Sequence, residues 1–194
     1  MVCFGFIGTG SMGSLLIRQF IKTGAVEATN IVASSKTGVS ARALAAETGI
    51  AVMESNSDVA GAADVLFVCV KPFDVRLVFE EIRDELSENK LLVSIAGIVS
   101  LENLADWSGP GVRCVRMMPS VTAAQNSGVS LVVWGRGVTS ADTELVVSLL
   151  SSIGTPVEIE EQYFDLFADL TSTAPAFFAA SIATPRACPR IRVV

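Results

Sequence analysis

The sequence contains no histidine, and this absence excludes several kinds of catalytic site. Ser-His-Asp and Cys-His catalysis need an imidazole as general base, and many hydroxyacid dehydrogenases need one for proton transfer. Zinc sites with histidine ligands are excluded for the same reason. Any chemistry that this chain supports must therefore work without an imidazole.

Clustered positive charge is also missing. The chain has 14 Lys and Arg residues against 20 Asp and Glu residues, which gives a net charge of -6. Its basic residues are scattered, and only the last ten residues carry three arginines close together. A nucleic-acid or anionic-membrane surface needs a patch of Lys and Arg. We therefore expect neither nucleic acid nor a membrane as a partner.

Cysteine pairs and long apolar runs are absent as well. Cys3, Cys69, Cys114 and Cys188 form no CxxC pair, and the first three lie in apolar stretches. This pattern predicts free thiols in a reducing cytoplasm and no metal site. No run approaches the roughly 18 apolar residues of a membrane helix, and the start of the chain lacks the basic segment of a signal peptide. We expect a cytoplasmic protein.

Hydrophobic residues, by contrast, make up 51% of the 194 positions. Such a chain can build one well-buried domain, so either a sheet is covered on both faces or apolar surface awaits a partner. Short apolar runs alternate with helix-length segments, which predicts an α/β fold with a mainly parallel sheet and flanking helices. The expected strands are 2–7, 30–34, 51–53, 65–70, 91–95, 112–117, 129–134 and 156–159, and the expected helices are 11–23, 38–48, 73–87, 100–107 and 140–152.

The first expected strand runs directly into the glycine loop GTGSMG. Gly8, Gly10 and Gly13 match the G-x-G-x-x-G pattern of Rossmann-type NAD(P)-binding folds, between a strand and a helix, where the motif has meaning. In that pattern the first glycine allows a tight turn, the second lets the backbone approach a pyrophosphate, and the third lets the helix pack close to the strand. A glycine turn without a ligand is the structural alternative.

The end of the second strand indicates which cofactor is used. An Asp or Glu there would bind the ribose 2′-OH of NAD, but this sequence has Ser34, Ser35, Lys36 and Thr37. Hydroxyls and an ammonium group can bind a 2′-phosphate, so we expect NADP(H) rather than NAD(H). A solvated polar turn of ordinary composition is the alternative.

Five motifs together resemble pyrroline-5-carboxylate reductase, the last enzyme of proline biosynthesis. They are GFIGTGSMG at the start, ASSK after the second strand, SDVAGAADVLFVCVKP, SIAG at 94–97 and RMMPS at 116–120. The resemblance covers about residues 2–182. The runs MPSVT, SGVSLVVWG and PAFFA resemble the late-competence (ComER-like) paralogues more than the biosynthetic enzymes.

The resemblance implies a cofactor site at particular positions. The pyrophosphate would contact the glycine loop, the 2′-phosphate the serines and lysine after the second strand, the adenosine side Asn56, and the nicotinamide side the two later loops. For Lys71 the alternative is a lysine at the end of a strand that caps the edge of the sheet without binding a ligand. The implied cofactor-binding residues are Gly8, Thr9, Gly10, Ser11, Met12, Ser34, Ser35, Lys36, Asn56, Val70, Lys71, Pro72, Ala96 and Gly97.

The family's reaction suits a chain without histidine, because the cofactor delivers a hydride to a protonated cyclic imine and no catalytic side chain is implied. The substrate carboxylate would meet Ser172 and Thr173, in a turn that opens a helical domain. The sequence departs from the family in three ways. The most serious is that the helical domain after Pro175 runs for only a couple of turns before Pro185 interrupts it. Ser120-Val121-Thr122 replaces Asn-Thr-Pro, and residues 171–176 lack the glycines of Ser-Gly-Ser-Gly-Pro-Ala.

The resemblance also divides the chain. We expect an NADP-binding Rossmann domain at 1–160, the start of a truncated helical dimerisation and substrate domain at 161–182, and an atypical tail at 183–194. Pro185 interrupts the helical pattern, and we interpret the tail as the product of truncation or a frame-shift in preference to a purposeful basic tail. Full-length relatives would be homodimers or larger. Here an uncovered apolar stripe predicts self-association; it comprises Phe164, Phe167, Leu170, Phe177, Phe178 and Ile182.

Two hypotheses on function follow. The first is an NADP-dependent reductase of the pyrroline-5-carboxylate type, weakly active or inactive as this chain. The second is a catalytically silent nucleotide-binding protein of the late-competence type. Another imine or β-hydroxyacid reductase with the same glycine loop is a weaker third reading.

Overall fold

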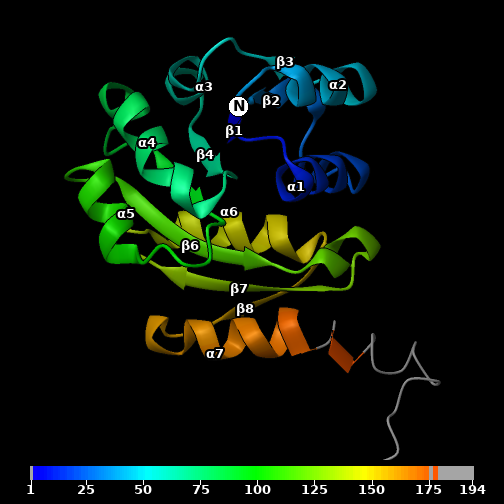
Figure 1. The fold of residues 1–194 in the computed structure, drawn as a ribbon, viewed down its shortest axis with the longest axis vertical. Coiled ribbons are helices and arrows are strands. Elements are labelled where there is room, and N and C mark those ends of the chain that lie inside the picture. Colours follow the sequence, from blue (N-terminus) through cyan, green and yellow to red (C-terminus); the bar gives the residue numbers. More distant parts are fainter. Residues whose placement is uncertain (1, 175–176, 179–194) are drawn as a thin grey trace, which may run out of the picture.

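The computed structural model describes residues 2–174 and 177–178, and these form one eight-stranded sheet with helices on both faces (Figure 1). The strand order is β3-β2-β1-β4-β5-β6-β7-β8. This arrangement confirms the predicted Rossmann-type α/β fold. The strands are β1 (Phe4–Ile7), β2 (Ile31–Ser34), β3 (Ala51–Val52), β4 (Val65–Val68), β5 (Leu91–Ser94), β6 (Arg113–Pro119), β7 (Gly128–Trp134) and β8 (Gly154–Glu158).

Helices connect most of the strands. The expected helix at 73–87 ends at Ile82 and is followed by a short 3-10 turn. The α-helices are α1 (Ser11–Lys22), α2 (Val39–Thr48), α3 (Asn56–Ala62), α4 (Pro72–Ile82), α5 (Leu101–Ser108), α6 (Ser140–Ser151) and α7 (Phe164–Ala168). The 3-10 turns are η1 (Ala28–Asn30), η2 (Arg83–Glu85), η3 (Val121–Gln125) and η4 (Glu161–Tyr163), and a π-helical turn, η5 (Asp169–Thr173), follows α7.

All strand pairs are parallel except β6 with β7. Those two strands are joined by η3 and a short turn instead of a full helical crossover, and such a short connection requires antiparallel strands. The sheet is therefore mainly parallel, as the alternating pattern predicted.

The helix α3 was not predicted. Ser55 caps it, because its side chain accepts a hydrogen bond from the Asp58 backbone N–H while the Asp58 carboxylate accepts one from the Ser55 N–H. Such a capping box is a known sequence signal for a helix start. The helix places Asn56 at its first position, next to the end of β2.

Apolar side chains fill both faces of the sheet. Phe6 stacks on Phe67 with ring centroids 4.7 Å apart, and this face is covered by α1, α2 and α6. The opposite face carries Leu66 and is covered by α3, α4 and α5. The high apolar content is therefore explained mainly by a sheet that is buried on both faces.

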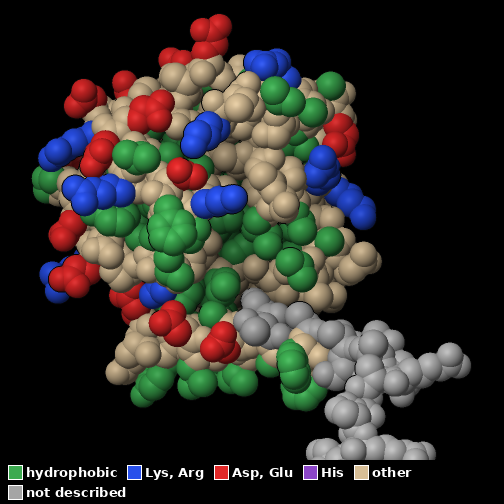
Figure 2. Space-filling model, in the orientation of Figure 1, with side chains coloured by type: hydrophobic (Ala, Val, Ile, Leu, Met, Phe, Trp, Pro, Cys, Tyr) green, Lys and Arg blue, Asp and Glu red, His purple; other side chains and the backbone are tan. Residues whose placement is uncertain are grey.

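The segment after β8 also packs on the sheet. Phe164 of α7 is 1% exposed and contacts Leu131 and Val133 of β7. The predicted apolar stripe is therefore wrong at Phe164, which the sheet itself covers. Phe167 is partly buried against the same cluster, whereas Leu170, Phe177 and Phe178 of the stripe are exposed. Leu166, which was not part of the predicted stripe, is exposed as well, and Figure 2 shows hydrophobic side chains along the outer face of α7. Ile182 and the predicted tail at 183–194 lie outside the described residues.

Candidate functional site

The carboxyl ends of β1, β2, β4 and β5 meet at one edge of the sheet. β1 lies between β2 and β4, so the chain leaves β1 toward one side and returns to the other side with β4. In open α/β sheets, ligands bind at such a switch point. The four loops that follow these strands contain most of the predicted cofactor residues.

The glycine loop has the geometry that its sequence predicts. Gly8 has a φ of +98°, and a Cβ atom there would lie 2.7 Å from the Cys69 carbonyl oxygen. A Cβ at Gly13 would collide with the Gly8 carbonyl, so α1 packs directly against the loop. A Cβ at Gly10 would meet no protein atom within 4 Å. The space in front of Gly10 is therefore open to a ligand.

The same loop leads into an uncapped helix. Gly10 is the N-cap of α1 and offers no side chain to its first N–H groups. Free N–H groups at a helix start favour a bound anion. Thr9 points away from this position, because it is 4% exposed and its Oγ1 lies 2.7 Å from Ser40 Oγ of α2. Ser11 and Met12 form the first turn of α1.

The residues after β2 divide into buried and exposed groups. Ser34 is 2% exposed, and its hydroxyl donates a 2.7 Å hydrogen bond to Asn56 Oδ1. Ser35 Oγ accepts a 3.3 Å hydrogen bond from the Ala41 N–H at the start of α2. The Lys36 side chain is 87% exposed. Lys36 and Ser35 are thus more accessible to a ligand than Ser34, whose hydroxyl is already bonded within the protein.

Asn56 links three elements at this edge. Its Oδ1 accepts from Ser34, and its Nδ2 donates a 2.7 Å hydrogen bond to Glu81 Oε2 of α4. These two bonds fix the orientation of the amide. Glu81 was not among the predicted residues, since nothing local to its sequence indicates a contact with the end of β2.

The loops after β4 and β5 hold the remaining predicted residues. Lys71 is the N-cap of α4, and Pro72 is its first residue, where a missing N–H costs no hydrogen bond. Ala96 is 2% exposed, and its N–H donates to Ser94 Oγ over 3.3 Å. The Gly97 carbonyl accepts a hydrogen bond from the Arg116 guanidinium. Val70, Lys71 and Gly97 therefore lie on neighbouring loops.

Arg42 is a second residue that sequence reasoning missed. It lies on α2, and its Nη2 donates a 3.3 Å hydrogen bond to the Thr37 carbonyl. Gly38 has a φ of +70°, and a side chain there would collide with the Arg42 guanidinium. The glycine therefore allows a second cation beside the loop that contains Lys36. The sequence signal was a basic residue in the first turn of the helix after β2.

A cavity of about 350 Å³ lies between the loop after β5 and the segment around α7. Gly97, Arg116, Phe164 and Asp165 are among the residues that line it. The predicted substrate residues, Ser172 and Thr173, lie further along the chain in η5. Their side chains are outside the described part of the structure, so their role stays a prediction.

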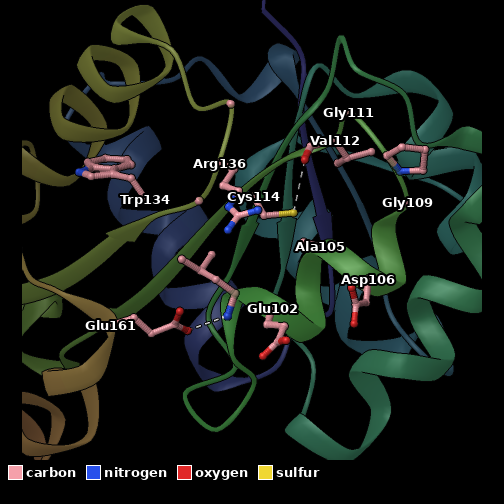
Figure 3. A pocket seen from close by; sticks show the side chains of 14 residues that line it. Glu102, Ala105, Asp106, Gly109, Gly111, Val112, Cys114, Trp134, Arg136 and Glu161 are labelled. Atoms are coloured by element: carbon pink, nitrogen blue, oxygen red, sulfur yellow. Dashed lines mark hydrogen bonds between the residues drawn. The ribbon is translucent and has the colours of Figure 1, made fainter.

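A larger cavity, of about 1000 Å³, lies elsewhere, between α5 and the turns at 109–112 and 135–137 (Figure 3). It contains none of the predicted residues. Glu102, Asp106 and Arg136 line it, and Cys114 lies at its wall. Burial raises the pKa of the Cys114 thiol, so it is protonated at neutral pH and is a poor nucleophile. We place the candidate site at the glycine loop, because this edge combines open backbone at Gly10, an uncapped helix start and an exposed cation at Lys36.

The three described cysteines have the properties of structural residues and not of reactive ones. Cys3, Cys69 and Cys114 are free, and burial raises the pKa of each. In the described part of the chain, no group of three or more His, Cys, Asp or Glu side chains is arranged to hold a metal ion. Over the same residues, no helix has the length and apolar character needed to cross a bilayer. Cys188 lies outside the described residues.

Comparison with known proteins gives one family and several relatives. Residues 3–97 match the family described as NADP oxidoreductase coenzyme F420-dependent. The chain is 34% identical over 173 residues to pyrroline-5-carboxylate reductase of Methanosarcina acetivorans, covering 89% of this chain and 64% of the relative. It is 31% identical over 178 residues to ComE operon protein 4 of Bacillus subtilis, covering 90% and 64%.

A solved structure agrees with these relatives. Pyrroline carboxylate reductase of Plasmodium falciparum with NADP bound superposes with a TM-score of 0.85 at 25% identity, covering 94% of this chain and 67% of that one. In the sequence comparisons, the chain spans about 64% of the length of each of the two relatives. Because sequence, fold and glycine loop agree, the chain corresponds to the N-terminal NAD(P)-binding domain of the pyrroline-5-carboxylate reductase family.

Proposed function

We propose that the chain binds NADP(H) at the carboxyl edge of β1, β2, β4 and β5. The observation that carries this proposal is the open space at Gly10 in front of the uncapped start of α1. A pyrophosphate there would accept hydrogen bonds from the N–H groups of Ser11 and Met12. The relative of known structure that shares the fold was solved with NADP bound.

Charge near the end of β2 supports NADP(H) over NAD(H). Lys36 and Arg42 are both cationic, and both belong to the stretch from 35 to 42 that follows β2. The stretch contains no acidic residue that would pair with a ribose 2′-OH or repel a 2′-phosphate. Ser35 adds a hydroxyl at the same position. The nicotinamide half would then extend toward Lys71, Ala96 and Gly97.

We further propose that the reaction of the whole protein is reduction of a cyclic imine of the pyrroline-5-carboxylate type. The bound cofactor would supply the hydride. The residues of this chain would position the nicotinamide and exclude water from it, and none of them is assigned a proton-transfer role. The name of the Methanosarcina acetivorans relative supports this proposal.

Cofactor binding without turnover is the second candidate. The similarity to ComE operon protein 4 favours it, as does the turn after β6. In that turn Ser120 is buried, and its Oγ lies 2.9 Å from Thr122 Oγ1. These hydroxyls bond to each other, which leaves less polar capacity for a substrate than a free amide would offer.

The experiment that tests the proposal has two stages. First, NADPH and NADH are titrated against the chain by intrinsic fluorescence. We expect NADPH to bind roughly tenfold or more tightly, because a charge-assisted hydrogen bond contributes about 1.5–3 kcal/mol. Equal or reversed affinities would contradict the cofactor assignment. Second, oxidation of NADPH is followed at saturating pyrroline-5-carboxylate.

The second stage separates the two candidates. It should use the 194-residue chain beside a version extended with the C-terminal third of a reductase relative. Turnover by the extended version alone supports the reductase reading. Absence of turnover from both, with NADPH bound, supports the silent nucleotide-binding reading. Self-association and a cytoplasmic location remain predictions.

A further inference from the structure

Arg116 of β6 is a buried cation that contacts the loop after β5 and the segment around α7. The residue is 6% exposed. Its Nη1 lies 3.0 Å from Glu161 Oε1. Its Nη2 donates a hydrogen bond to the Gly97 carbonyl and lies 3.6 Å from Asp165 Oδ1. Its guanidinium carbon lies 3.7 Å from the centre of the Phe164 ring. One side chain thus connects the loop after β5 to the chain after β8.

Glu161 completes the connection from the other side. The oxygen that binds Arg116 also accepts a 2.7 Å hydrogen bond from the Leu101 N–H, at the start of α5. The loop between β5 and α5, residues 95–100, is therefore held at Gly97 by Arg116 and just beyond its end by Glu161. We call Arg116 and Glu161 the 116–161 pair.

Burial makes the pair important for the position of this loop. The Arg116 side chain is 7% exposed, so water compensates poorly if it loses its partner, whereas the Glu161 side chain is 35% exposed and keeps some contact with water. The guanidinium also requires a specific geometry, because one of its arms binds the Glu161 carboxylate and the other binds the Gly97 carbonyl. A change at either residue should shift Gly97 while the strands on either side remain packed.

We propose that Arg116 is a positioning residue: through the 116–161 pair it holds the 95–100 loop where the nicotinamide half of the cofactor binds. This proposal rests on the cofactor site proposed above. It predicts that the nicotinamide half of the cofactor, but not the adenosine half, depends on the chain after β8. The region from η4 to α7 would then be part of the cofactor site.

The test compares two ligands on the full 194-residue chain. NADPH carries both halves of the cofactor, whereas adenosine 2′,5′-bisphosphate carries only the half that would bind at Gly10, Lys36 and Arg42. Glu161→Gln removes the charge of the acceptor and keeps its size. Arg116→Lys keeps the charge and removes the second arm. Both variants are checked by circular dichroism and thermal melting.

We expect both variants to bind NADPH roughly tenfold more weakly, since Glu161→Gln removes the charge from the hydrogen bond within the pair and Arg116→Lys removes one of the two arms that hold the loop. Their affinity for adenosine 2′,5′-bisphosphate should stay within about twofold of wild type, and the fluorescence of bound NADPH should fall as the nicotinamide becomes mobile. Because the two residues act as one unit, the double variant should be no weaker than the weaker single variant.

Glu47→Gln is the matched control. It breaks the ion pair that Glu47 forms with Arg18 at 2.8 Å, between α1 and α2 and on the surface. It should change neither affinity. If the Glu161 and Arg116 variants lose both ligands equally, or lose neither, the positioning role is wrong. If wild type binds neither ligand, the cofactor site itself is wrong, and the 116–161 pair has no loop to position for it.

Discussion

Lys36 Nζ lies 3.9 Å from Asp74 Oδ1, so the lysine that would bind a 2′-phosphate has a carboxylate near it in the free protein. Asp74 is in the first turn of α4, after the loop that contains Lys71. Both side chains are substantially exposed, and such surface pairs contribute only about 0–1 kcal/mol. The carboxylate should nevertheless oppose a dianionic phosphate at the same position.

Asp74→Asn should therefore raise the affinity for NADPH and leave that for NADH unchanged. We expect a gain of about twofold to fivefold at low salt, from a surface interaction of up to about 1 kcal/mol, and a smaller gain at high salt. Fluorescence titration at two salt concentrations measures it. Glu80→Gln removes a charge from the same helix, where Glu80 pairs with Arg76 at 3.1 Å, and should have no such effect. A parallel gain for NADH would contradict this explanation.

Arg42→Ala should reduce the preference for NADPH over NADH. The guanidinium beside Gly38 supplies a second cation for the 2′-phosphate, and loss of a charge-assisted hydrogen bond is worth roughly tenfold in affinity. Arg42→Lys should recover part of the loss, because it restores charge without the second arm. Arg18→Ala is the control, since Arg18 is on α1 and pairs with Glu47. An unchanged NADPH to NADH ratio in Arg42→Ala would remove Arg42 from the site.

Gly10→Val should abolish cofactor binding without unfolding the domain. No protein atom lies within 4 Å of a Cβ at this position, so the fold tolerates a side chain that a pyrophosphate does not. The comparison is Gly13→Ala, where the new methyl group would collide with the Gly8 carbonyl. That variant should lower the melting temperature, whereas Gly10→Val should not. Nucleotide affinity like that of wild type in folded Gly10→Val would refute the loop assignment.

The glycine loop could be predicted because all of its information is local. The strand, the turn at Gly8 and the close helix contact at Gly13 are encoded in a short continuous stretch, and Gly8 and Gly13 each have a separate steric reason to be glycine. The alternation of strands and helices predicted the sheet for the same reason. The antiparallel pairing of β7 was less evident, since it depends on the shortness of the turn around η3.

Arg116 and Glu81 were not predicted, because their contacts join distant positions. Arg116 is 45 positions from Glu161 and 19 from Gly97, and the sheet and the packing of α7 bring them together. Glu81 meets Asn56 in the same way, across 25 positions. The helix α3 was missed for a local reason: it spans only seven residues and includes a helix-weakening glycine, Gly61. Its capping box at Ser55 and Asp58 was the stronger signal.

Burial of Cys69 predicts a loss of stability at alkaline pH. Cys69 directly follows β4 beside the glycine loop and is buried, and this burial raises the pKa of its thiol in the folded state above the roughly 8.5 of a free cysteine. Above about pH 8.5 the unfolded chain loses this proton while the folded chain keeps it. The unfolded state then binds fewer protons, so the free energy of unfolding falls as pH rises.

The fall should reach about 1.4 kcal/mol per pH unit for this one thiol between about pH 9 and 10. Urea unfolding at pH 7.5, 8.5, 9.5 and 10 measures it, in wild type and in Cys69→Ala. The alanine keeps the Cβ atom that packs beside Gly13 and removes only the titrating group. We expect Cys69→Ala to be less stable than wild type at pH 7.5, because it leaves a small cavity, but to lose less stability toward pH 10. Equal slopes in the two proteins would show that the thiol of Cys69 does not carry the alkaline sensitivity.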